Sequence, residues 1–190
     1  MCTGIKFGTM YVLRIITIKE CSVAEDTEKT LVLFKPDSLQ RGLVGEILSR
    51  FEKVGLRIVA TKMLAPGREH YQKHYEGIGK LKTRAGDHIF DITLEMMNNG
   101  PVIAMVFEGV EAVSLVRKLV GSTEPKSSAP GTIRGDFSHM SYGYADRKDK
   151  GIPNLIHASG DPQEAEKEIG HWFSDDELFN YQALHEKFTR

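Results

Sequence analysis

Four short apolar runs, separated by stretches with helical periodicity, constrain the fold of this 190-residue chain more than any other feature. The runs are Leu31–Phe34, Leu56–Leu64, Val102–Phe107 and Asn154–Ser159, and each has the length of a buried strand. Helical spacing is expected over Leu43–Val54, Pro66–Tyr75, Ile89–Asn98, Val110–Val120 and Pro162–Phe173. Strands interleaved with helices predict an α/β sandwich in one domain, with helices on one face of a small mixed sheet.

Composition and charge exclude several classes of protein. Hydrophobic residues make up 41% of the chain and the formal net charge is −1, so neither a disordered chain nor a general nucleic-acid or membrane-surface binder is expected. No apolar run reaches membrane-spanning length, and Arg14 interrupts Tyr11–Ile18, which is the nearest candidate for a signal core. The two cysteines, Cys2 and Cys21, form no disulfide framework, so a reducing cytoplasm is expected.

The first 29 residues differ from the rest of the chain. Met1–Lys29 holds both cysteines, one apolar patch and a polar link. This segment is interpreted as a flexible extension, as an added strand, or as an artefact of the assigned start. The main domain is expected from Thr30 to the end.

A histidine in the fourth apolar run is the strongest candidate for chemistry. In a strand, His157 and Ser159 point to one face together with Leu155. A lone histidine in a strand is usually structural, but Glu168 stands at the edge of the apolar stripe of the next helix. A carboxylate on one imidazole nitrogen frees the other as a nucleophile. The alternative, a glutamate that merely sits at the rim of its helix face, is equally open.

Three cations at the ends of elements add to this hypothesis. Lys35 precedes Pro36, Arg117 lies at the edge of a helical stripe, and Arg134 stands between two glycines. Each alone is typical of a surface charge, but together they suit polyphosphate binding, because phosphoryl transfer depends on positioning and charge neutralisation.

Other nucleotide and metal motifs are missing from the sequence. It has no Walker A pattern, and Gly77-Ile78-Gly79 is only a fragment of a dinucleotide fingerprint. His70 and His74 have a spacing that allows metal binding on a helix, but no third ligand follows, so a solvated helix face is favoured over zinc.

Several blocks in order carry a family resemblance. They are LVLFKPDSLQRGLVGEIL, the pair His74-Tyr75, GPVIAMVFEG, PGTIRGDF and NLIHAS. From about Thr30 to Phe173 the chain resembles the nucleoside diphosphate kinase family. The resemblance implies a ferredoxin-like βαββαβ domain, with helices packed on a four-stranded antiparallel sheet, in a homo-oligomer that is usually a hexamer and sometimes a tetramer or dimer. It also implies γ-phosphate transfer from a nucleoside triphosphate such as ATP to a nucleoside diphosphate, by a ping-pong mechanism through phosphohistidine, with Mg²⁺ on the nucleotide phosphates.

The resemblance also assigns roles at the transferred phosphate. His157 resembles the nucleophile, phosphorylated on Nδ1, and Glu168 resembles the carboxylate that orients the ring through the other nitrogen. Ser159 resembles a supporting hydroxyl, and Tyr75 the tyrosine beside the transferred group. Because protonated imidazole is no nucleophile and model histidine titrates near ~6.5, acid is expected to suppress the first half-reaction.

Further roles concern the nucleotide. Lys35 matches the lysine that binds the phosphates and the ribose 3′-hydroxyl. Asn154 matches the asparagine that contacts the ribose. Arg117 and Thr123 match the pair on the β-phosphate, and Arg134 the arginine near the γ-phosphate.

Three departures from the family pattern matter. The aspartate after the histidine is displaced by one residue, so Asp161 is not assigned as a metal ligand and no protein metal ligand is expected. The segment after Tyr75 is longer than usual, with an insertion near 76–88. The base-stacking position there falls on Ile89 by gapless alignment, but Phe90 is preferred on chemistry. A second insertion, 138–153, precedes the active strand and either rims the pocket or contributes to a subunit interface.

Competing functions remain open from the sequence. They are a nucleotide-binding sensor without turnover, a kinase that passes phosphate from His157 to another protein, and an interaction role for the N-terminal extension. The intact set of site residues argues against the sensor.

Overall fold

The computed structural model describes residues 27–78 and 80–189. The extension expected at 1–29 therefore lies outside the described residues, except for its last three positions, which belong to the first strand. Among the described helices, none is long and apolar enough to cross a membrane.

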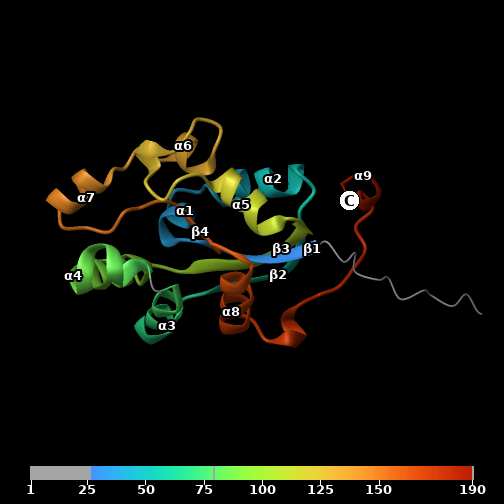
Figure 1. The fold of residues 1–190 in the computed structure, drawn as a ribbon, viewed down its shortest axis with the longest axis horizontal. Coiled ribbons are helices and arrows are strands. Elements are labelled where there is room, and N and C mark those ends of the chain that lie inside the picture. The colour runs from blue at the N-terminus through green and yellow to red at the C-terminus, as the bar shows by residue number, and fades with distance from the viewer. Residues whose placement is uncertain (1–26, 79, 190) are drawn as a thin grey trace, which may run out of the picture.

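Four antiparallel strands form one sheet at the centre of the molecule (Figure 1). The strands are β1 (Thr27–Phe34), β2 (Arg57–Leu64), β3 (Val102–Val110) and β4 (Ile156–Ala158). Their order is β2-β3-β1-β4, and every pairing is antiparallel. The ferredoxin-like sheet implied by the family resemblance is confirmed, and the mixed sheet expected from the pattern alone is wrong.

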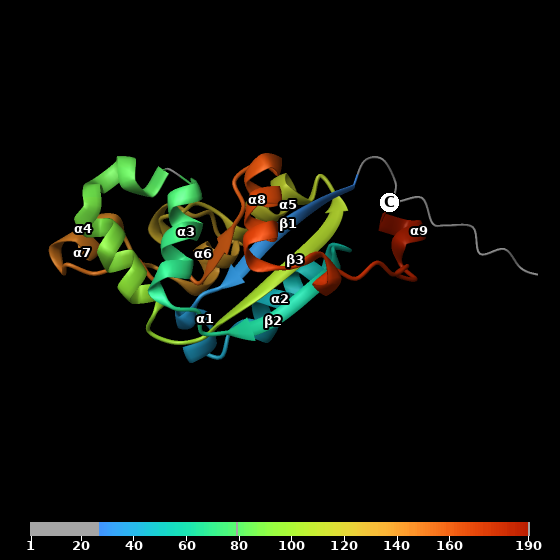
Figure 2. The ribbon, with the colours of Figure 1, turned by 90° about the horizontal axis from the view of Figure 1, so that it is seen from below.

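Helices cover both faces of the sheet, whereas the sequence pattern predicted one covered face. The helices α2 (Val44–Lys53) and α5 (Ala112–Val120) lie on one face, and α3 (Arg68–Ile78) and α8 (Pro162–Trp172) on the other (Figures 1 and 2). The reason lies in β1, where Leu31 and Leu33 pack into one core cluster and Val32 and Phe34 into another, all four fully buried. A strand that is apolar on both sides requires cover on both sides.

The long segment between β2 and β3 is more helical than expected. The helix α4 (Lys80–Met97) includes residues 80–88, which the sequence pattern left irregular, and it merges two helical pieces at Gly86. Gly86 has a φ of 75°, a left-handed value that glycine adopts without a steric cost. This break allows α4 to turn across the end of the sheet (Figure 2).

Short elements complete the fold. They are α1 (Pro36–Gln40), the 3₁₀ turn Pro125–Ser127, α6 (Ile133–Phe137), α7 (Tyr142–Arg147), the 3₁₀ turn Asp175–Glu177 and α9 (Glu186–Thr189). The helix α7 lies inside the 138–153 insertion, where Ser141 caps it by accepting the Tyr144 amide. The helix α8 begins at a cap, since Asp161 accepts the Glu164 amide and Pro162 follows directly.

The strand that carries His157 is shorter than predicted, and Leu155, expected on the face of His157, lies on the other face. Leu155 has a φ of 70° and packs in the same cluster as Ile156 and Ala158. Its amide donates to Asp37 Oδ2 at 2.9 Å and its carbonyl accepts the Lys35 amide at 2.9 Å. This turn breaks the alternation before β4, so Leu155 does not share a face with His157 as expected.

Candidate active site

His157 and Ser159 converge on one carboxylate of α8. His157 Nε2 lies 2.8 Å from Glu168 Oε1, and Ser159 Oγ donates to Glu168 Oε2 at 2.6 Å. The register of the sheet explains this meeting, because His157 pairs with Leu33 of β1 and faces the core cluster that contains residues of α8. Glu168 is 5% exposed, so it is buried against the histidine and is not a rim residue of its helix.

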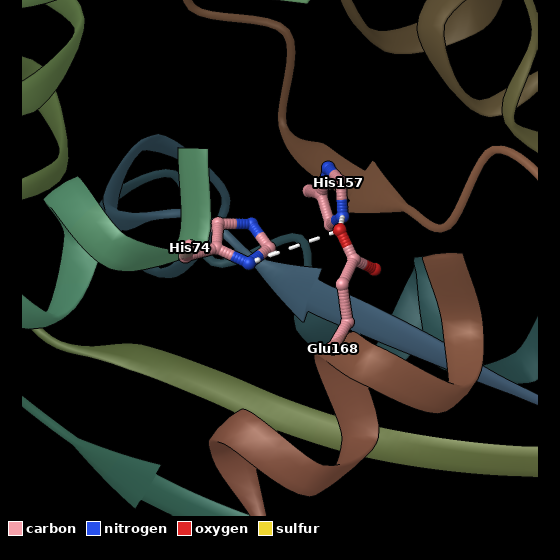
Figure 3. Close-up of side chains that lie close together, drawn as sticks. All are labelled: His74, His157 and Glu168. Atoms are coloured by element: carbon pink, nitrogen blue, oxygen red, sulfur yellow. Dashed lines mark hydrogen bonds and ion pairs between the residues drawn. The ribbon is translucent and has the colours of Figure 1, made fainter. Parts of the chain in front are cut away.

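The contact with Glu168 sets the tautomer of the histidine. The carboxylate accepts from Nε2, so Nε2 carries the proton and Nδ1 keeps its lone pair. Figure 3 shows this second nitrogen pointing away from Glu168. The His157 side chain is 13% exposed and lines a cavity, so part of the imidazole belongs to an accessible surface.

His74 is a site residue that sequence reasoning missed. Its ring packs edge-on against that of His157, with centroids 4.6 Å apart and planes at 87° (Figure 3). Trp172 Nε1 donates to His74 Nδ1 at 3.2 Å, and the same nitrogen lies 3.8 Å from Glu168 Oε1. One signal was available in the sequence: Trp172 follows Glu168 by four residues, which places both on one face of α8.

His74, His157 and Glu168 could in principle hold a metal ion, since one donor atom from each lies within 4.8 Å of the others. Two of their nitrogens already have partners within the protein, whereas the buried His74 Nε2 has none among the described residues. His74 Nδ1 accepts a hydrogen bond from the Trp172 indole N–H, and His157 Nε2 is hydrogen-bonded to Glu168. His70 does not join the group, so the pairing of His70 with His74 considered for zinc is not formed.

A cavity of about 340 Å³ opens in front of His157. Its lining includes seven of the residues assigned by the family resemblance: Lys35, Tyr75, Arg117, Thr123, Arg134, Asn154 and His157. These residues come from five separate segments of the chain, so the fold alone brings them together. The positive charge of Lys35, Arg117 and Arg134 beside a nucleophilic imidazole suits a phosphorylated ligand.

The side chain of Asn154 connects two walls of the cavity. Its Oδ1 accepts from Lys35 Nζ at 2.8 Å, and its Nδ2 donates to the Thr123 carbonyl at 2.9 Å. Because both lysine and asparagine are nearly fully buried, this network fixes the position of the ammonium group before any ligand binds.

Arg134 is held by the backbone around β4. Its three guanidinium nitrogens donate to the carbonyls of Asn154, Gly121 and Ile156 at 3.1, 3.1 and 2.6 Å. The side chain is 3% exposed. Arg134 therefore supports the turn into β4 as well as placing positive charge at the cavity wall.

Tyr75 contributes a hydroxyl with no hydrogen-bond partner. The oxygen is buried, and the side chain lines the cavity. Burial raises the pKa of the phenol, so it remains protonated and able to donate. A buried hydroxyl without a partner costs free energy, and a phosphoryl oxygen in the cavity would satisfy it.

Burial and like charge set the protonation of the site. The pKa of His157 is held well below its usual value by burial and by the charges of Lys35, Arg134 and Arg117. Burial and the neighbouring Arg134 lower the pKa of Lys35 to about 8. Burial raises the pKa of Glu168. At neutral pH the imidazole is therefore uncharged, as a nucleophile must be.

Phe90, the preferred candidate for the base contact, does not line the cavity. It is 5% exposed and packs in the core cluster with Leu94 and Tyr71. Ile89, the alternative from gapless alignment, does line it. Neighbouring positions on a helix point about 100° apart, so chemistry alone could not override the alignment.

The arrangement has the parts that phosphoryl transfer needs. It places a neutral imidazole with an oriented ring, three cations that neutralise phosphate charge, and a protonated phenol at one cavity. Transfer of a phosphoryl group to Nδ1 would leave an imidazolium-like ring that Glu168 stabilises through Nε2.

The comparisons with known proteins agree with this chemistry. A family model described as nucleoside diphosphate kinase matches residues 28–178. Two relatives are each 45% identical to this chain. A nucleoside diphosphate kinase from Borreliella burgdorferi matches over 155 residues, covering 82% of this chain and 92% of the relative. A nucleoside diphosphate kinase B from Rattus norvegicus matches over 156 residues, with the same coverage.

Solved structures give the same result. A transition-state mimic of nucleoside-diphosphate kinase from Borrelia burgdorferi, with bound vanadate and ADP, superposes with a TM-score of 0.81 at 44% identity. The match covers 85% of this chain and 95% of that one. A halophilic nucleoside diphosphate kinase from Halobacterium salinarum in complex with CDP has a TM-score of 0.73 at 36% identity, covering 86% and 98% of the two chains.

Proposed function

The chain belongs to the nucleoside diphosphate kinase family and is a phosphotransferase, and we propose that it transfers phosphate through Nδ1 of His157. In this proposal the γ-phosphate of a nucleoside triphosphate, typically ATP, passes to His157 and then to a nucleoside diphosphate in a ping-pong cycle. The observation that carries the proposal is the bond of His157 Nε2 to Glu168, which leaves Nδ1 as the nitrogen at the cavity.

The first half-reaction uses the cations of the cavity. Arg117, Thr123 and Arg134 hold the phosphates, while Lys35 and Asn154, already bonded to each other, meet the ribose and phosphates. Neutral His157 attacks the γ-phosphorus in line; the N–P bond forms as the bond to the bridging oxygen breaks, and the nucleoside diphosphate leaves with that electron pair. Glu168 and Ser159 stabilise the ring as it gains positive character.

The second half-reaction is the reverse of the first. A different nucleoside diphosphate occupies the same cavity, and its terminal phosphate oxygen attacks the phosphohistidine. The phenol of Tyr75 donates to the transferred phosphoryl group in both directions, which accounts for its buried hydroxyl without a protein partner. Ile89 takes over the base-contact role first considered for Phe90.

Mg²⁺ fits this site as a companion of the nucleotide. The cavity lining supplies two carboxylates in the described part of the chain, Asp146 and Glu164, and the Glu164 carboxylate already accepts the Gly160 amide at 2.7 Å. Mg²⁺ commonly keeps several waters and takes its other ligands from phosphates. When bound in this way it supplies charge neutralisation, and no protein side chain is proposed as a ligand.

A phosphoenzyme test separates a kinase from a nucleotide-binding module. Incubation with γ-labelled ATP is expected to give an acid-labile, base-stable label on the wild-type chain and on His139→Ala, whose histidine is exposed and outside the cavity. The His157→Ala variant is expected to carry no label and to exchange no phosphate. Unchanged exchange in His157→Ala would overturn the assignment of the nucleophile.

Assembly and location complete the proposal. A homo-oligomer, most simply a hexamer, is supported by large apolar side chains that are exposed in the single chain, including Phe179 and Leu184. A cytoplasmic location is supported by the scarcity of cysteine in the sequence. Sedimentation of the intact chain tests the assembly.

A further inference from the structure

The chain turns sharply just before the strand that carries His157. Leu155 has a φ of 70°, and the Ile156 amide donates to the Asn154 carbonyl at 2.8 Å, so the three residues form a γ-turn with a left-handed centre. A residue with a side chain is strained at the centre of such a turn, and the turn persists only where its surroundings hold it. Asn154 and His157 flank the turn and both line the cavity, so its shape decides how these two side chains face one ligand.

Asp37 holds this turn from outside the cavity. It lies in the first turn of α1, which is beside β4 (Figure 1), and its Oδ2 accepts the Leu155 amide at 2.9 Å. The Lys35 amide donates to the Leu155 carbonyl at 2.9 Å, so the segment after β1 fixes both backbone polar groups of the strained residue. Asp37 is not among the residues that line the cavity, and it therefore acts on a bound nucleotide only through residues that do.

The other support of the turn cannot replace this contact. Arg134 donates to the carbonyls of Asn154 and Ile156 at 3.1 and 2.6 Å, but a guanidinium accepts no hydrogen bond. Leu155 is fully buried, and a buried amide without an acceptor costs free energy. Loss of the Asp37 oxygen would therefore favour a relaxed backbone at Leu155, in which the side chains on either side of the turn are re-aimed.

The carboxylate of Asp37 also balances the cations of the cavity. Burial and Arg134 lower the pKa of Lys35 to about 8, and the negative charge of Asp37 opposes this shift. His157 of β4 and His74 of α3 also face Lys35, but the pKa of each is held well below its usual value, chiefly by burial, so both are uncharged at neutral pH. Asp37 thus helps to keep the ammonium group of Lys35 charged as the pH rises.

We propose that Asp37 is a positioning residue for phosphoryl transfer, which holds the γ-turn at Leu155 so that Asn154 and His157 meet the same nucleotide, and which supplies a counter-charge to Lys35. The inference rests on the proposed kinase function and adds a residue that lies outside the cavity. The hydrogen bond to Leu155 acts on alignment and the charge acts on Lys35, so variants can separate the two contributions.

Removal of the side chain tests the alignment. In Asp37→Ala the Leu155 amide loses its acceptor, and the second-order rate of phosphoenzyme formation from γ-labelled ATP is expected to fall about 10²-fold, the effect of a misplaced reacting group. Glu28→Ala is the matched control, because Glu28 Oε2 also accepts a backbone amide, that of Val113 at 3.2 Å, but outside the cavity. That control is expected to keep the wild-type rate, and urea denaturation of both variants measures what each loses in stability.

A conservative substitution separates the hydrogen bond from the charge. Asp37→Asn keeps an oxygen for the Leu155 amide, so the rate at neutral pH is expected to recover most of what Asp37→Ala loses. The negative charge is gone, however, and Lys35 then gives up its proton more readily. The alkaline fall of the rate, expected above about pH 8 in the wild type, should therefore begin at a lower pH in Asp37→Asn.

The outcomes are distinct. A large loss in Asp37→Ala, with recovery at neutral pH and a lowered alkaline limit in Asp37→Asn, supports the inference. It is overturned if Asp37→Ala keeps the rate of Glu28→Ala, if Asp37→Asn loses as much as Asp37→Ala at neutral pH, or if the alkaline limit does not move. Should Asp37→Ala fail to fold, the alkaline limit of Asp37→Asn decides alone. Failure of the wild-type chain to form phosphoenzyme would instead refute the proposed function.

Discussion

At the scale of single residues, the site depends on how one imidazole is kept neutral and oriented. The bond to Glu168 at 2.8 Å selects the tautomer, and the edge-on ring of His74 limits rotation of the imidazole. Burial and three nearby cations lower the pKa of His157. The same cations that we propose as phosphate ligands therefore also keep His157 from being protonated.

The pH profile of phosphoenzyme formation follows from these shifts. A lowered pKa means that His157 stays neutral as pH falls through 6.5, so the acid loss expected from model histidine is displaced to well below that value. On the alkaline side, Lys35 loses its charge near its pKa of about 8. The second-order rate with ATP, which reports the free enzyme, should be flat between these limits and fall above about pH 8. A midpoint near 6.5 on the acid side would contradict this account.

A second residue-scale prediction concerns Glu168. The Glu168→Gln variant keeps the shape of the side chain but removes its negative charge, so the developing imidazolium loses its stabilising partner. We expect the rate of phosphoenzyme formation to fall by about 10²-fold, while the KM for nucleotide changes little, because Glu168 does not line the cavity. Rapid-quench measurements on the variant and the wild type, over a range of nucleotide concentrations, check that the rate falls while the KM does not change. A large rise in KM with an unchanged rate would place Glu168 in binding.

At the scale of elements, the helix α8 carries the residues that support the histidine. Glu168 and Trp172 lie one turn apart on its buried face, and Trp172 reaches His74 on α3. The helix begins at a strong cap, Asp161 with Pro162. The cap therefore fixes the start of the helix, and with it the positions of Glu168 beside His157 and of Trp172 beside His74.

The indole of Trp172 gives a prediction at this scale. Trp172→Phe keeps an aromatic ring but removes the N–H that bonds His74 Nδ1, so a buried acceptor loses its donor. We expect stability to fall by about 1–3 kcal/mol and phosphoenzyme formation to slow several-fold, with the KM for nucleotide unchanged. Urea denaturation and rapid quench measure the two effects. Lys167→Gln on the same helix is the control, since Lys167 is exposed.

The cap of α8 gives a second prediction at the scale of elements. Asp161→Ala removes the acceptor of the Glu164 amide, so we expect a loss of about 1 kcal/mol in the free energy of unfolding. Because Asp161 is used as a cap and does not line the cavity, the dependence of activity on Mg²⁺ concentration should stay the same. A weakened response to Mg²⁺ in the variant would mean that this aspartate helps to hold the ion.

Elements also show what sequence reasoning can and cannot predict. The strands, the capped start of α8 and the pairing of His157 with Glu168 follow from local patterns and from the family resemblance. The face of Leu155 could not be predicted, because its left-handed backbone is imposed by distant partners, Lys35 and Asp37. His74 was missed for the same reason, since its role depends on a helix about 100 residues later in the chain.

At the scale of the whole molecule, the chain after α8 runs back along the sheet. Phe179 donates its amide to the Val59 carbonyl at 2.9 Å, and Lys62 pairs with Glu177 at 2.7 Å. The buried Arg57 pairs with Glu108 at 2.6 Å and also bonds Asn180 and the Tyr181 carbonyl. The tail is thus anchored near β2 by polar contacts and by Leu178, which packs against the core, although Phe179, Leu184 and Phe188 remain exposed.

These exposed side chains predict an intersubunit contact. Phe179, Leu184 and Phe188 are 66%, 94% and 81% exposed in the single chain, an arrangement that a monomer seldom maintains. If the wild type assembles into the proposed homo-oligomer, we expect the double variant Phe179→Ser/Leu184→Ser to shift it toward smaller species at micromolar concentration, as measured by sedimentation velocity. Gln182→Ser, an exposed polar position in the same tail, should leave the assembly intact. Because the site residues all come from one chain, phosphoenzyme formation should survive in the smaller species. An unchanged mass in the double variant would show that the tail lies outside the subunit contacts.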